Sequence, residues 1–162
     1  MLNCPETCPR CGDPWLGPFC EQCGYSYSTV RLPTWCAVIA PDREYFDTAG
    51  AAAQWFTFPA SSQPRRVTLT GSLVRIGRHS RSRGIPEIDL GVPPADPCVS
   101  REHAWLLAQP DGSWAVRDDG SENGTYLNGG TTRIPITQPI PLTDGDQVHL
   151  GVWTTITLHR DR

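Results

Sequence analysis

Lysine is absent from the 162 residues of this chain, so arginine supplies all 14 basic side chains apart from histidine. No apolar run approaches the roughly 20 residues that a membrane-spanning helix requires. The N-terminus also lacks the basic and then apolar layout of a secretion signal. These absences predict a cytoplasmic protein that has no membrane partner.

Excess charge of either sign is lacking too, because the formal net charge is −3 and the isoelectric point is about 5.7. A weakly acidic chain of this kind is not typical of nucleic-acid-binding proteins. Codon bias in a GC-rich genome explains why arginine replaces lysine. It does not explain why Arg75, Arg78, Arg81 and Arg83 crowd into one short segment.

Cysteine, by contrast, is plentiful, and in a cytoplasmic chain its seven copies indicate metal binding rather than disulfides. Residues 1–27 contain two Cys-x-x-Cys-Gly units, which resemble the zinc-ribbon family. Two thiolates separated by two residues can both reach one Zn²⁺ from a tight turn, and the following glycine permits the left-handed conformation that closes the turn. The resemblance implies a structural Zn²⁺ with four ligands: Cys8, Cys11, Cys20 and Cys23.

Alternatives to this metal site remain open from the sequence. Cys4 is a further thiol that could replace Cys8 as a ligand, and a pair of disulfides could join the same cysteines. A thioredoxin-like redox pair is disfavoured because no βαβ pattern surrounds either unit. Four thiolates leave no open position for a water molecule, so we expect no catalysis at this metal.

Beyond a polar linker at residues 28–34, apolar residues recur with the period of two that is typical of β-strands, and each short run ends at a turn signal such as Asn123-Gly124. With 15 glycines and 16 prolines, the composition favours short elements joined by turns. Residues 48–54 are alanine-rich and form the only helix candidate, although they are short. The alternating pairs are Val67/Leu69, Val74/Ile76, Trp114/Val116, Val148/Leu150 and Ile156/Leu158.

Four motifs in order make residues 35–162 resemble the forkhead-associated (FHA) domain family: Gly77-Arg78, Ser100-Arg101-Glu102-His103, Asn123-Gly124-Thr125 and Leu142-Thr-Asp-Gly-Asp146. The resemblance implies an all-β fold, an eleven-stranded antiparallel β-sandwich of the FHA/SMAD-like type. It also implies binding of phosphothreonine peptides and no enzymatic activity. The predicted organisation is therefore a zinc ribbon (1–27), a linker (28–34) and an FHA domain (35–162).

The residues of these motifs suit phosphopeptide binding on chemical grounds. A phosphothreonine carries nearly two negative charges, which Arg78 can pair with through charge-assisted hydrogen bonds while Arg101 adds a second cation. The hydroxyl of Ser100 can donate to the phosphate. Asn123 carries an amide that suits the main chain of the ligand, and it is followed by Gly124. By the resemblance, Gly77 and His103 hold the loops in place.

Each of these residues also has a purely structural interpretation. Arg78 could be an exposed arginine, Ser100 a turn-forming hydroxyl, and Asn123-Gly124 an ordinary hairpin turn. Arg81 and Arg83 could contact an acidic ligand residue or simply be solvated. Members of the family often carry Thr or Ser just before the Asn-Gly pair, whereas this chain has Glu122. Its carboxylate either points away from the phosphate, or lowers affinity by repelling it, or selects ligands with basic neighbours.

The leading functional hypothesis is an adaptor that binds a protein phosphorylated by a Ser/Thr kinase, with a second protein partner possible at the zinc ribbon. The alternative is a nucleic-acid or protein scaffold led by the ribbon, with a phospho-independent FHA domain. Hydrolysis by Ser100 and His103 is disfavoured because no nucleophile-elbow pattern surrounds the serine. A kinase acting on Thr7, Thr29 or Thr34 would supply an internal ligand at high effective concentration.

Overall fold

A computed structural model describes residues 7–8, 10–14, 20–24 and 33–161 of the chain. It divides into two compact units, Met1–Leu32 and Pro33–Arg162. Cys4, Thr29 and residues 28–32 of the predicted linker lie outside the described residues.

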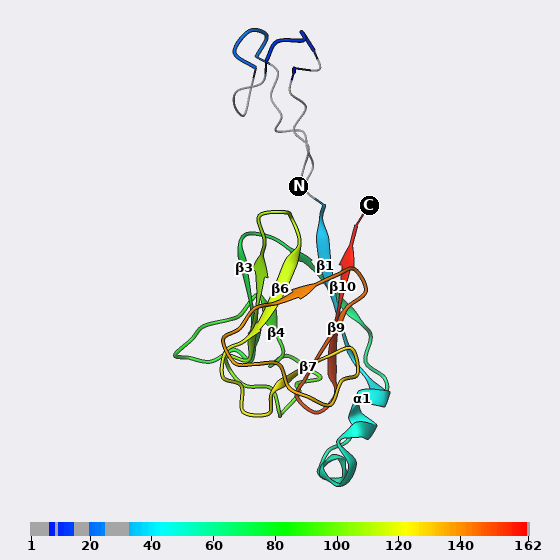
Figure 1. Ribbon diagram of the computed structural model, residues 1–162. Helices are drawn as coiled ribbons and strands as arrows, with labels where there is room; N and C mark the ends of the chain where they lie inside the picture. Colours follow the sequence, from blue (N-terminus) through cyan, green and yellow to red (C-terminus); the bar gives the residue numbers. More distant parts are fainter. Residues whose placement is uncertain (1–6, 9, 15–19, 25–32, 162) are drawn as a thin grey trace. The chain divides into compact units, whose positions relative to one another are not determined.

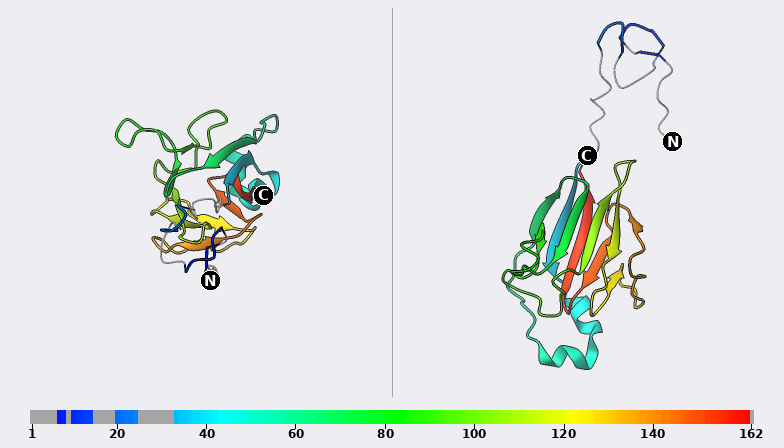
Figure 2. Two further views of the ribbon diagram at one scale, coloured as in Figure 1. Left: turned by 90° about the horizontal axis from the view of Figure 1, so that it is seen from above. Right: turned by 90° about the vertical axis from the view of Figure 1, so that its left-hand side faces the viewer.

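The larger unit is a sandwich of two five-stranded β-sheets (Figures 1 and 2). One sheet has the order β2-β1-β10-β9-β7 and the other β4-β3-β5-β6-β8. The all-β fold class predicted from the sequence is confirmed. The bounds are β1 Trp35–Pro41, β2 Arg65–Leu69, β3 Leu73–Gly77, β4 Ile88–Asp89, β5 Ala104–Ala108, β6 Trp114–Asp118, β7 Thr125–Leu127, β8 Ile140–Leu142, β9 Gln147–Leu150 and β10 Thr154–Arg160.

The sandwich differs from the implied antiparallel, eleven-stranded arrangement in its number of strands and in the direction of one strand. Ten strands are present among the described residues. The short strand β4 runs parallel to β3, pairing Ile76 with Ile88 and Gly77 with Asp89, whereas the other strand pairs of both sheets are antiparallel. A parallel partner can be accommodated here because the long β3–β4 connection brings the chain back to the same edge.

One apolar core fills the space between the sheets. Ile156 and Leu158 of β10 and Leu106 of β5 are fully buried in it, as is Val116 of β6. Most of the alternating apolar residues in the sequence belong to this cluster. Burying them supplies the main favourable term in folding, about 1.5–3 kcal/mol for each large apolar side chain.

A helical insertion joins β1 to β2 and consists of α1 (Arg43–Thr48) and the 3₁₀ helix η2 (Gly50–Trp55). The side chain of Asp42 caps α1 by accepting a hydrogen bond from the N–H of Tyr45 at 3.1 Å. Gly50, with φ of +55°, then ends the α-helix, so the single candidate at residues 48–54 is corrected to two short helices. None of the described helices is long and apolar enough to cross a membrane.

The ends of the sandwich carry different features. Trp35 at the start of β1 pairs with Arg160 near the end of β10, so the chain enters and leaves the sandwich at one end. The other end carries α1 and, as Figure 1 shows, the connections that follow β3, β4 and β6. The predicted site residues Arg78, Ser100 and Asn123 occupy these three connections.

Candidate functional site

Arg78 is tied directly to the loop that contains Ser100. Its N–H donates to the carbonyl of Ser100 at 3.2 Å, and its Nε donates to the carbonyl of Val99 at 2.5 Å. The side chain is half-buried, and it forms no ion pair with any described residue. Because Nε is occupied by a neutral carbonyl, the positive charge of the guanidinium stays available for an anion.

Gly77 allows this close approach of two segments. A Cβ atom at this position would lie 2.1 Å from the carbonyl oxygen of Arg101 and 3.0 Å from that of Ser100. Main-chain atoms cannot move aside as a flexible side chain can, so any larger residue would separate β3 from the 100–101 loop. The glycine is therefore required by packing and not by its backbone angles.

The hydroxyl of Ser100 joins the second loop to the third. Its oxygen accepts a hydrogen bond from the N–H of Glu122 at 3.1 Å. A serine hydroxyl also carries a proton of its own, and among the described residues no acceptor takes it. The hydroxyl can therefore donate to a ligand while it holds the 120–124 loop.

His103 is fully buried and connects two main-chain segments. Its Nδ1 accepts from the N–H of Ser100 at 3.0 Å, so Nε2 carries the proton and donates to the carbonyl of Gly124, also at 3.0 Å. Both ring nitrogens are thus occupied by the backbone. His103 cannot take a proton from the hydroxyl of Ser100, which argues against the hydrolytic arrangement.

Burial lowers the pKa of His103 below its ordinary value, and it also lowers that of the buried His149. Below a pH of about 6.5 the unfolded chain binds protons on these histidines that the folded chain does not, so the free energy of unfolding should fall as the pH is lowered through this value. Urea unfolding at a pH of about 7.5 and about 5.5, with NMR titration of each imidazole, checks this. A His103 imidazole that titrates at its unfolded value would contradict the expectation.

Asn123 and Gly124 form the third part of this cluster. The amide nitrogen of Asn123 donates to the carbonyl of Cys98 at 2.9 Å, while the side chain remains exposed. Gly124 has φ of +84°, and a Cβ there would lie 3.1 Å from the side chain of Arg133. Arg133 in turn donates to the carbonyl of Ser121 at 3.0 Å. This arginine adds positive charge beside the loop, and the motif pattern did not single it out.

A buried aspartate orders the 119–124 loop. Oδ1 of Asp118 accepts from the N–H groups of Gly120 and Ser121, and Oδ2 accepts from the hydroxyls of Ser121 at 2.6 Å and Thr125 at 2.7 Å. Burial by itself would raise the pKa of Asp118, but these hydrogen bonds hold it below its ordinary value. The motifs in the sequence do not single out Asp118, although an aspartate followed by serine three positions later is a recognisable turn pattern.

A second buried carboxylate, Asp96, was also missed. It accepts hydrogen bonds from the N–H groups of Val152, Trp153 and Thr154, from the hydroxyl of Thr154 at 2.8 Å, and from the N–H of Cys98 at 3.0 Å. These contacts attach the loop before Ser100 to the β9–β10 turn. The donors are main-chain groups distant in sequence, so no local pattern signals them.

The other charged side chains discussed from the sequence lie in the same loops and differ in whether they have a partner. Arg101 and Arg81 are exposed and make no hydrogen bond or ion pair with the described residues. Arg83 forms an ion pair with Glu102 at 3.2 Å, so its charge is partly neutralised. The side chain of Glu122 is exposed and has no described partner, while its backbone N–H contacts Ser100.

Next to Asn123 lies a groove with a volume of about 670 Å³. The helical insertion lines it with Tyr45, Ala49 and Phe56, and the opposite side comes from Tyr126 of β7 and the turn that follows β7. The groove is continuous with the cluster because Asn123 and Cys98 belong to its lining.

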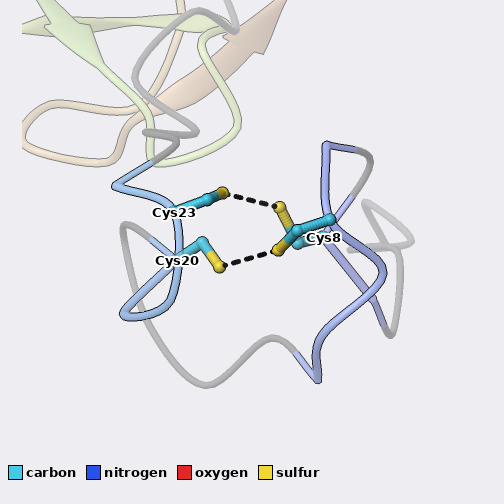
Figure 3. A group of neighbouring side chains, drawn as sticks. Cys8, Cys20 and Cys23 are labelled. Atoms are coloured by element: carbon cyan, nitrogen blue, oxygen red, sulfur yellow. Dashed lines mark hydrogen bonds between the residues drawn. The ribbon is translucent and has the colours of Figure 1, made fainter.

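In the N-terminal unit, four thiols gather around a common centre (Figure 3). The sulfur atoms of Cys8, Cys11, Cys20 and Cys23 all lie within 4.8 Å of one another, with 3.7 Å between Cys8 and Cys23 and 3.5 Å between Cys11 and Cys20. A tetrahedron with Zn–S bonds of about 2.3 Å has edges of about 3.8 Å, so the sulfurs fit a metal ion. The separations are far longer than a disulfide bond of about 2.05 Å. Four thiolates can therefore hold a metal such as zinc here.

The turns around these cysteines have the geometry that the repeated Cys-x-x-Cys-Gly spacing predicts. Gly12 and Gly24 have φ values of +81° and +68°, which are left-handed conformations. Each donates its N–H to the carbonyl of the first cysteine of its unit, Cys8 or Cys20, at 2.8 Å. The glycine after each pair is therefore what brings two thiols to the same side of a turn.

Comparison with known proteins relates the sandwich to a known domain family. Residues 74–151 match the FHA domain family. An FHA domain-containing protein of Arabidopsis thaliana is 35% identical over 89 residues, which are 55% of this chain and 20% of the plant protein. The oxoglutarate dehydrogenase inhibitor of Corynebacterium diphtheriae is 36% identical over 97 residues, covering 60% of this chain and 58% of that protein. The chain thus spans less than two thirds of the length of these curated relatives.

Solved structures of FHA domains share this fold. The solution structure of the FHA domain of an Arabidopsis thaliana hypothetical protein superposes with a TM-score of 0.56 at 24% sequence identity. The superposition covers 81% of this chain and 88% of that chain. Similarity at this level of identity shows a common fold.

Proposed function

Because this chain contains a forkhead-associated domain, we propose that it is a cytoplasmic adaptor that binds phosphothreonine peptides of proteins modified by a Ser/Thr kinase. In this proposal the phosphate lies between Arg78 and Ser100, with Arg101 adding a second positive charge. Asn123 and Gly124 bind the main chain of the peptide beside it. Gly77 and His103 fix the loops, and the protein has no catalytic role.

One observation carries this proposal: the guanidinium of Arg78 is bonded to the residue next to Ser100 and is not neutralised by any described acidic group. A half-buried, unneutralised cation beside a hydroxyl donor favours a dianion over a neutral ligand. The hydrogen bond from Glu122 to Ser100 brings Asn123 into the same cluster, so a peptide held by its phosphate also meets an amide.

The proposal predicts that Arg78→Ala lowers affinity for a phosphothreonine peptide at least tenfold, because losing one charged hydrogen bond costs about 1.5–3 kcal/mol. The peptide would first be selected from a degenerate library with phosphothreonine fixed at its centre, and fluorescence anisotropy would then give the affinity. Arg81→Ala is the matched control, because Arg81 is an exposed arginine of the same loop without a described partner. Equal binding of phosphorylated and unphosphorylated peptide by the wild-type protein would contradict the proposal.

For the N-terminal unit we propose a structural Zn²⁺ held by Cys8, Cys11, Cys20 and Cys23, with a possible second protein partner at this unit. The fit of the four sulfur atoms to a tetrahedron supports the ion. Its role would be to fold a segment that is too short to bury a core of its own.

A further inference from the structure

The groove beside Asn123 is larger than binding a phosphate requires. Its volume of about 670 Å³ lies within the range of ligand-binding pockets, about 300–1,000 Å³. One wall is formed by the helical insertion, which precedes the family-matched region 74–151. This wall therefore lies outside the part of the chain that the family match covers.

Tyr45 and His149 both line the groove, and hydrogen bonds hold the imidazole of His149 in its neutral form. The rings of Tyr45 and His149 stack there with centroids 4.9 Å apart. Nε2 of His149 accepts from the N–H of Gly129 at 3.0 Å, so Nδ1 carries the proton and donates to the hydroxyl of Thr155 at 2.7 Å. That hydroxyl donates to Asp42 at 2.9 Å. Burial lowers the pKa of His149, which keeps the imidazole neutral.

The charged side chains that line the groove are both acidic, since they are Asp42 and Glu44. No arginine of the described residues belongs to its lining, although Arg78 and Arg133 belong to the neighbouring loops. The same lining includes apolar and aromatic surface contributed by Tyr45, Phe56 and Tyr126. A lining that combines carboxylates with apolar and aromatic surface matches a side chain that has a long aliphatic stem and a positive end.

Resting on the proposed function, we infer that this groove binds a basic segment of the phosphorylated partner, with lysine or arginine on one side of the phosphothreonine. The peptide leaves Asn123 and enters the groove, where its aliphatic stems pack on the ring of Tyr45 and its cationic ends approach Glu44. The exposed carboxylate of Glu122, which is unfavourable for a bare phosphate, adds to the same preference for basic neighbours. The positive charge of Arg78 and the negative charge of the groove thus bind opposite charges on the peptide, and together they fix its direction.

The test uses the full chain and a peptide library with phosphothreonine fixed and the flanking positions degenerate. Wild-type protein should enrich lysine and arginine at positions on one side of the phosphothreonine. Glu44→Lys should reduce affinity for the selected peptide by about two- to fivefold, the range expected for exposed ion pairs, and remove the enrichment. Asp47→Lys is the control, because it makes the same charge change on the same helix at a residue that does not line the groove. It also breaks the exposed Arg43–Asp47 ion pair, which contributes at most about 1 kcal/mol.

A second variant, Ala52→Arg, places a cation at an exposed position of η2 in the lining and should have the same effect as Glu44→Lys. Phosphate-dependent binding without basic enrichment, or with enrichment that survives both groove variants, would overturn the inference and leave the proposed function standing. Basic enrichment that is independent of phosphate would support the groove and overturn the proposed function.

Discussion

Chelation of the metal should unfold the N-terminal unit while the sandwich remains folded. Structural zinc in peptides of this size contributes an apparent binding free energy of about 10–16 kcal/mol, which is also the free energy that folds them. The four cysteines are held together by two tight turns, and a segment this short has little apolar surface to bury. We therefore expect one zinc per chain by elemental analysis. Four thiols should become reactive when a chelator removes the metal.

Cys20→Ser is the variant to compare with Cys98→Ser, because Cys98 is a free cysteine outside the cluster. The first should lose zinc and release the remaining three thiols, whereas the second should retain one zinc per chain. Affinity for a phosphothreonine peptide should be unchanged by chelation. Metal-free protein with protected thiols under reducing conditions would show that the cluster is not a metal site.

Asp96→Ala should destabilise the sandwich by about 3–5 kcal/mol, the cost of leaving buried polar groups without their charged partner. Its carboxylate accepts from three consecutive main-chain N–H groups and a hydroxyl of the β9–β10 turn, and from Cys98. Because alanine leaves these donors buried and unpaired, the midpoint of urea unfolding should fall sharply. Affinity for phosphopeptide should fall with it, since the loop before Ser100 loses its attachment.

Asp111→Ala provides the comparison for this loss. Asp111 also accepts hydrogen bonds at a turn, from the N–H and hydroxyl of Ser113, but it is exposed and water can replace it. The expected cost there is at most about 1 kcal/mol. If the two variants were equally stable, the buried network around Asp96 would not be what holds the loop to the turn.

Much of this fold follows from alternation in the sequence. Val74 and Ile76 in β3 and Ile156 in β10 point into the core as the period of two predicts. His149 departs from the pattern, because alternation with Val148 and Leu150 predicts an outward-facing side chain at this position and the side chain is buried instead. The helical insertion covers it with Tyr45, and such a cover belongs to the tertiary structure rather than to the strand itself.

The candidate site likewise contains residues that the sequence predicts and residues that it does not. Arg78, Ser100 and Asn123 could be chosen from short motifs because each is placed by the turn in which it lies. Asp96 and the groove could not be predicted from short motifs, because both depend on contacts between segments 50 or more residues apart in the sequence. Alternation does not predict β1 either, because Cys36 and Ala37 are buried on successive faces of the strand.

The pairing of Trp35 with Arg160 makes this sandwich easy to transplant. Its entry and exit strands are neighbours in one sheet and open at the end away from the loops that contain Arg78, Ser100 and Asn123. A host polypeptide could therefore accept the whole module in one surface loop, through two adjacent junctions, without spreading its own backbone. Tethering through either junction would likewise leave the loops facing outward.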